Sequence, residues 1–76
     1  MEEKGMTKEM AELEKKFTYH PPKGDQAERY GRLRAFAKEF ALDILDMCPE
    51  SRERSLAMTK LEESVFWANA SIARNE

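Results

Sequence analysis

The sequence has little of what a small protein normally uses to stabilise itself. It has 76 residues and a single cysteine, Cys48, so no disulfide can form within the chain. Cys48 also lacks the Cys and His neighbours of a zinc site, so no metal is expected. A chain of this length buries only a small core and often needs a partner. These absences favour burial against further copies of the same chain.

Long hydrophobic runs are absent as well. No apolar stretch approaches the roughly 20 residues that span a bilayer, and the first ten residues lack the apolar core of a signal peptide. The lone cysteine fits a reducing compartment. We therefore expect a protein of the cytoplasm with no membrane partner.

An excess of either charge is also missing. The chain has 13 basic and 15 acidic residues, a net charge of −2, and the two signs alternate along it. A nucleic-acid-binding domain is usually strongly basic, and a membrane-surface helix gathers its cations on one face. DNA and membrane surfaces are therefore not expected as partners.

Recognisable catalytic motifs are absent. The chain has one histidine, His20, and no phosphate-binding loop, zinc-protease motif or nucleophile elbow. We predict that the protein is not an enzyme and uses no cofactor.

The few prolines divide the chain into helices. One all-α domain is predicted over residues 1–76, with an N-terminal helix within 1–16 whose periodic pattern starts near Glu3. An extended segment over 17–24 contains Pro21 and Pro22. Two long helices over 25–47 and 51–74 then form an antiparallel hairpin, because Pro49 separates them by a short turn. Asp25 is expected to begin a capping box with Glu28, and Ser51 to cap the last helix.

Apolar residues recur at spacings of three and four in each expected helix. The stripes are Met6, Met10, Leu13 and Phe17; Tyr30, Leu33, Ala37, Phe40, Ile44 and Met47; and Met58, Leu61, Val65, Ala68 and Ile72. Phe36, Phe66 and Trp67 fall outside these stripes. The first helix is expected to cover only part of this surplus, so the three aromatic residues predict a homo-oligomer interface.

A glycine, Gly31, lies inside the second expected helix. Glycine destabilises a helix interior by about 1 kcal/mol relative to alanine. Two interpretations stay open: the helix simply tolerates the glycine, or another group approaches the backbone closely at this position.

The segment FTYHPPKGD, residues 17–25, is the strongest candidate for a ligand site. Tyr19 offers a stacking surface, and Lys23 and Arg34 offer positive charge to an anion. The helical pattern does not choose among Arg29, Arg32 and Arg34. Each of these residues also has an ordinary interpretation as a packing, loop or surface residue, so the pattern alone predicts only an oligomeric helical hairpin.

Three segments carry a more specific resemblance. FTYHPP at 17–22, ERYGRLRAFAKEFA at 28–41 and CPESRERSLAMTKLEESVFWANASIARN at 48–75 resemble the phage anti-CBASS cyclic-oligonucleotide sponges. A related hairpin occurs in the anti-Thoeris sponges, which capture cyclic ADP-ribose signals. The resemblance covers Phe17 to Asn75.

The resemblance implies a helical homohexamer that sequesters cyclic dinucleotides such as cGAMP, and also cyclic trinucleotides, without catalysis. It implies that Tyr19 and Arg34 bind the dinucleotide between two protomers, with His20 and Lys23 as further candidates. The family often has lysine where this chain has Arg34. A separate trinucleotide site is expected near the end of the third helix, with Arg74 and Asn69. The alternatives are capture of cyclic ADP-ribose, or an adaptor oligomer without a ligand.

Overall fold

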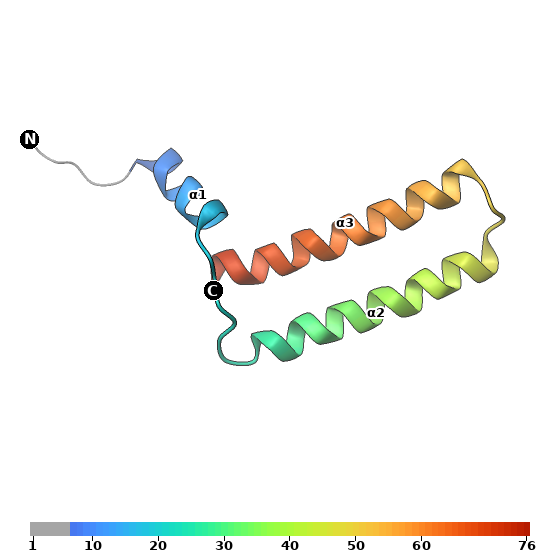
Figure 1. Ribbon diagram of the computed structural model, residues 1–76, viewed down its shortest axis with the longest axis horizontal. Helices are drawn as coiled ribbons and strands as arrows, with labels where there is room; N and C mark the ends of the chain where they lie inside the picture. Colours follow the sequence, from blue (N-terminus) through green and yellow to red (C-terminus); the bar gives the residue numbers. More distant parts are fainter. Residues whose placement is uncertain (1–6) are drawn as a thin grey trace, which may run out of the picture.

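The computed structural model describes residues 7–76, and this part of the chain is all-helical, with three helices and no strand (Figure 1). Helix α1 spans Lys8–Phe17, α2 spans Gln26–Met47 and α3 spans Arg52–Asn75. The predicted fold class is therefore confirmed at this level. Helix α1 starts later than the pattern indicated, because Thr7 has extended backbone angles and its Oγ1 accepts a hydrogen bond from the amide of Met10. Met6 and the expected start at Glu3 lie outside the described residues.

The turn between α2 and α3 is closed by side chains from its own ends. Ser51 caps α3 as predicted, with its Oγ 3.0 Å from the amide nitrogen of Arg54. The guanidinium of Arg54 reaches back and donates to the main-chain oxygens of Leu45 and Cys48. These carbonyls have no partner within the last turn of a helix, so Arg54 stabilises the end of α2.

The start of α2 differs from the prediction. The carboxylate of Asp25 makes no capping hydrogen bond, so the predicted capping box is wrong. Its Oδ1 instead accepts from Nε of Arg29, at 3.1 Å. Gly24 has a φ of +57°, which permits the tight turn by which the chain enters the helix. This turn is closed by a hydrogen bond from the amide of Gln26 to the main-chain oxygen of Lys23.

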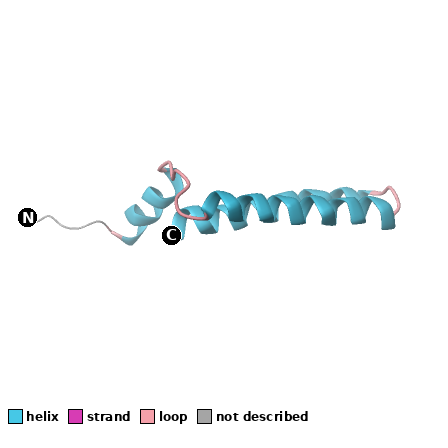
Figure 2. Cartoon of the chain, turned by 90° about the horizontal axis from the view of Figure 1, so that it is seen from below, coloured by secondary structure: helices cyan, strands magenta, loops and turns pink. Residues whose placement is uncertain are grey.

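Helices α2 and α3 lie side by side and run in opposite directions, with α1 set off from the end where α3 finishes (Figure 1). The second view shows that α2 and α3 form a layer only one helix thick (Figure 2). Such a layer has two broad faces, and each is open in the single chain.

The line of contact between α2 and α3 uses most of the expected stripes. The residues predicted for the stripe on α3 are all half-buried: Met58, Leu61, Val65, Ala68 and Ile72. On α2 the half-buried residues include Leu33, Ala37, Ala41 and Ile44. Phe40 and Met47 are exposed, which corrects the predicted stripe. Ala41 takes the position expected of Phe40, because a small side chain suits close contact between helices.

The described chain has no buried hydrophobic residue, and its one buried side chain is that of Gln26, at 3% exposure. Helix α1 does not provide the cover that was expected for part of the surplus apolar surface, since Phe17 is 80% exposed. The accessible surface is 6238 Å², whereas a folded monomer of this mass exposes about 4,800 Å². The single chain therefore leaves apolar surface uncovered.

Among the described residues, no helix combines the length and the apolar character needed to cross a bilayer.

Candidate functional site

A groove of about 390 Å³ lies where the end of α1 and the loop after it meet the hairpin. Its walls come from four parts of the chain: α1, the loop, α2 and α3. The lining residues are Lys16, His20, Tyr30, Arg34, Asn69, Ala70, Ala73 and Arg74. The small side chains of Ala70 and Ala73 leave room between the larger ones, so the groove is formed by the sequence of α3 as much as by the loop.

The lining is positively charged. Lys16, Arg34 and Arg74 each contribute a cation, and none of the lining residues is an aspartate or glutamate. Within the described part of the chain, Arg34 forms no salt bridge. An arginine without a carboxylate partner keeps its planar donors available for an anion such as phosphate.

Arg74 is partly held by an aromatic side chain of its own helix. Its guanidinium carbon lies 6.0 Å from the ring centre of Trp67, a cation–π contact. Trp67 is itself fixed by a hydrogen bond from Nε1 to Glu63, at 3.3 Å. That bond and the neighbouring Lys60 hold the pKa of Glu63 below its usual value. This chain of contacts along α3 limits the positions available to Arg74.

Asn69 lies on the groove wall with an unsatisfied oxygen. Its Oδ1 is buried, and no donor among the described residues reaches it. A buried amide oxygen without a donor is costly, so groups outside this single chain are the natural partners for the amide.

His20 enters the groove from the loop, and its position is fixed from behind. Its Nε2 lies 2.8 Å from the main-chain oxygen of Lys15, in the last turn of α1. A carbonyl oxygen only accepts, so Nε2 carries the proton and a neutral His20 keeps Nδ1 as an acceptor. Pro21 and Pro22 follow immediately and restrict the backbone on the other side.

The structure brings together four of the six residues predicted to bind ligand. His20 and Arg34, expected in one site, line the same groove as Asn69 and Arg74, expected in another. Tyr19 and Lys23 do not line it. Tyr19 is 79% exposed, and the ammonium of Lys23 donates to the main-chain oxygen of Glu76, at 2.8 Å.

A second, mostly apolar groove of about 490 Å³ continues along the same face of the hairpin. Arg34 and Asn69 line both grooves, and Phe66 lines the second. Phe36 lies elsewhere, beside a smaller groove of about 260 Å³ that also includes Arg32. Trp67, the third predicted interface residue, is exposed and lines none of these three grooves.

Four lining residues were missed from the sequence: Lys16, Tyr30, Ala70 and Ala73. Tyr30 precedes Arg34 by one helical turn, so their shared face was a signal that the spacing contained. Lys16 had no such signal, because the placement of α1 against the hairpin is not encoded in a local pattern. Among the described residues, no cluster of side chains suits a metal ion.

Comparison with models of protein families identifies a related family. The model of the Acb2/Tad1 hairpin domain family matches residues 10–73. No curated protein and no solved structure matched the chain. The family match spans most of the chain and contains α2, the loop that carries Tyr19 and His20, and α3 as far as Ala73, so Arg74 lies beyond it. The chain therefore belongs to the Acb2/Tad1 hairpin domain family, the anti-CBASS and anti-Thoeris sponges, as the sequence resemblance predicted.

Proposed function

We propose that this protein captures cyclic oligonucleotide messengers in an infected bacterial cell and so prevents them from activating CBASS effectors. Membership of the sponge family over residues 10–73 is the observation that carries the proposal. The groove adds chemical support, because three cations and no carboxylate line it. Such a lining attracts a compact polyanion, and a cyclic dinucleotide such as cGAMP has two phosphates.

Each proposed binding residue has a role that its chemistry supports. Arg34 donates to phosphate through two nitrogens. Tyr19, with its ring exposed, stacks on a base, an interaction worth about 1–3 kcal/mol. His20 offers Nδ1 at the groove, and Lys23 adds positive charge in the same loop as Tyr19. Asn69 and Arg74 extend the site toward the end of α3 and serve cyclic trinucleotides.

The proposed assembly is a homo-oligomer, a hexamer by the resemblance. Phe36, Phe66 and Trp67 are the proposed interface residues, and all three are exposed in the single chain. A twofold interface presents each residue twice. Two copies of Tyr19 and Arg34 then match the two bases and two phosphates of a cyclic dinucleotide.

The proposed mechanism is sequestration without turnover. A messenger held in the groove does not reach its effector, so affinity and copy number set the effect. No proton transfer or bond cleavage is required.

Capture of a cyclic ADP-ribose signal is the second candidate, because the family match joins both kinds of sponge. Such a ligand also carries phosphates and an adenine base, so the same cations and Tyr19 suit it. The third candidate is an adaptor oligomer without a small ligand, which the exposed aromatic residues favour on their own.

A ligand panel distinguishes the three candidates. Melting temperature is measured with cyclic dinucleotides, cyclic trinucleotides and a cyclic ADP-ribose isomer, followed by calorimetry on any that raise it. A rise with cGAMP or a cyclic trinucleotide supports the main proposal, and a rise with the cyclic ADP-ribose isomer alone supports the second. No shift and no heat with any of them leaves the adaptor.

Tyr19→Ala then tests the stacking role within the main proposal. We expect this variant to lose cyclic dinucleotide binding and to keep the oligomer mass. Unchanged binding contradicts the assignment of Tyr19.

A further inference from the structure

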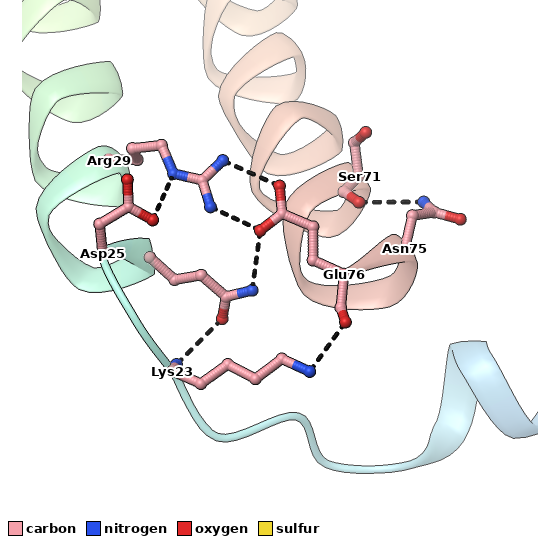
Figure 3. A network of polar contacts seen from close by, with 7 residues as sticks. Lys23, Asp25, Arg29, Ser71, Asn75 and Glu76 are labelled. Carbon is pink, nitrogen blue, oxygen red and sulfur yellow. Dashed lines mark hydrogen bonds and ion pairs between the residues drawn. The ribbon is translucent and has the colours of Figure 1, made fainter.

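Glu76, which follows α3, contacts three residues from two other segments at one point (Figure 3). The carboxylate of Glu76 accepts hydrogen bonds from two nitrogens of the Arg29 guanidinium, one of them at 2.8 Å. It also accepts from Nε2 of Gln26, at 3.1 Å. Its main-chain oxygen accepts from the ammonium of Lys23, at 2.8 Å. Glu76 thus ties the end of α3 to the start of α2 and to the loop.

Gln26 passes this restraint into the loop. Its Nε2 donates to the Glu76 carboxylate, and its Oε1 accepts from the main-chain amide of Lys23, at 3.1 Å. The two partners fix the orientation of the amide, because a carboxylate only accepts and an N–H only donates. Gln26 is also the one buried side chain of the described chain, so it has little freedom to reorient.

The loop is held at its other end by His20. Its ring nitrogen is bonded to the main-chain oxygen of Lys15, and only Pro21 and Pro22 separate it from Lys23. Prolines have a fixed φ, so this short segment is stiffer than an ordinary loop, and the position of one end restricts the position of the other. Fixing Lys23 therefore also fixes the approach of His20 to the groove.

We propose that Glu76 is a positioning residue for the ligand site: through Gln26 and Lys23 it holds the His20–Pro21–Pro22 segment in its binding conformation. The proposal rests on the proposed function for its effect on affinity, but its structural part stands without a ligand. A loop already ordered in the free protein has less conformational freedom to lose when a ligand binds.

The structural part is tested by hydrogen exchange on the full chain without ligand, comparing wild type with Glu76→Ala. We expect exchange of the Lys23 amide to rise about tenfold, while the middles of α2 and α3 keep their protection. Glu53→Ala is the control, because it removes an exposed carboxylate from the first turn of the same helix, at the opposite end from Glu76. Unchanged loop exchange in Glu76→Ala overturns the proposal.

Glu76→Gln is the second variant in case Glu76→Ala does not fold. It keeps one acceptor oxygen and loses the charge, so we expect an intermediate rise in exchange at Lys23. Loss of protection throughout both helices in both variants shows a role in the whole fold and overturns a positioning role.

Affinity for cGAMP is measured on the same proteins by calorimetry. We expect about 3- to 10-fold weaker binding for Glu76→Ala and no change for Glu53→Ala, since a binding conformation populated less often lowers the apparent affinity in proportion. Equal affinity of Glu76→Ala and wild type, beside a more mobile loop, overturns the positioning role. No binding by wild type, with the exchange result as expected, contradicts the proposed function and leaves the restraint of the loop intact.

Discussion

Arg29 and Glu76 face each other at the open end of the hairpin, the first on the opening turn of α2 and the second at the end of α3. Both terminal nitrogens of the guanidinium reach the two oxygens of the carboxylate. The hydrogen bonds from Arg29, followed by the one from Gln26, lower the pKa of Glu76 to about 2. The pKa of Arg29 is raised, chiefly by the same hydrogen bond.

The first prediction concerns stability at acid pH. A carboxylate whose folded pKa is depressed stabilises the protein above its unfolded pKa, about 4.3 for glutamate, and loses that effect as the pH falls through the folded value. We therefore expect the difference in melting temperature between wild type and Glu76→Gln to be constant above about pH 5 and to vanish toward pH 2. Melting curves from pH 2 to 7 check it. A difference that grows as the pH falls contradicts the ion pair.

The second prediction compares two arginines on α2. Arg34 lines the charged groove, whereas Arg32 lines the smaller groove beside Phe36, with its guanidinium carbon 5.9 Å from that ring centre. We expect Arg34→Ala to weaken cGAMP binding by about 10-fold or more, because a charge-assisted hydrogen bond is lost. Arg32→Ala removes the same charge two residues away and is expected to change affinity less than twofold. Calorimetry measures both, and equal losses contradict the assignment of Arg34.

The third prediction concerns oligomer mass. We expect light scattering to give a mass above the 8.9 kDa of one chain. Trp67→Glu is expected to lower that mass, because it puts a charge where the proposed interface buries an aromatic ring. Ala57→Glu adds the same charge to an exposed position on the same helix and removes little apolar surface, so it serves as the control. Wild type that scatters as a monomer contradicts the assembly.

The fourth prediction concerns Gly31. A Cβ built there has only Nη2 of Arg34 within 4 Å, at 3.8 Å, so no close backbone approach within the chain requires the glycine. We expect Gly31→Ala to stabilise the fold by about 0.5–1 kcal/mol, since alanine is the better helix former. Thermal or urea unfolding measures this. A destabilised variant indicates instead that a second copy or a ligand approaches the backbone at Gly31.

The sequence predicted the three helices well, because proline positions and apolar spacing are local signals. The cap at Ser51 followed for the same reason. The capping box at Asp25 failed because a competing partner, Arg29, takes the carboxylate. The placement of α1 was also missed, since it depends on contacts between distant segments such as that of Lys15 with Asn75.

The candidate site was predicted in parts and not as a unit. Arg34 and Arg74 were both identified, but their spacing of 40 residues gave no indication that one groove holds them. That arrangement follows from the antiparallel course of α2 and α3, which puts residues near the start of one helix beside residues near the end of the other. The role of Glu76 was invisible for a similar reason, because its partners lie about 50 positions earlier in the chain.

A hairpin only one layer thick also changes how amino-acid replacements are tolerated. In most domains, buried residues stabilise the fold and a different set of residues, on the surface, contacts ligands and partners. Here nearly every side chain outside the contact between α2 and α3 is on a surface, and Arg34 and Asn69 line two grooves at once. A systematic scan of substitutions is therefore expected to find that the positions least tolerant of change are exposed in the single chain. Such positions identify residues that contact a ligand or another copy of the chain, and not residues of a buried core.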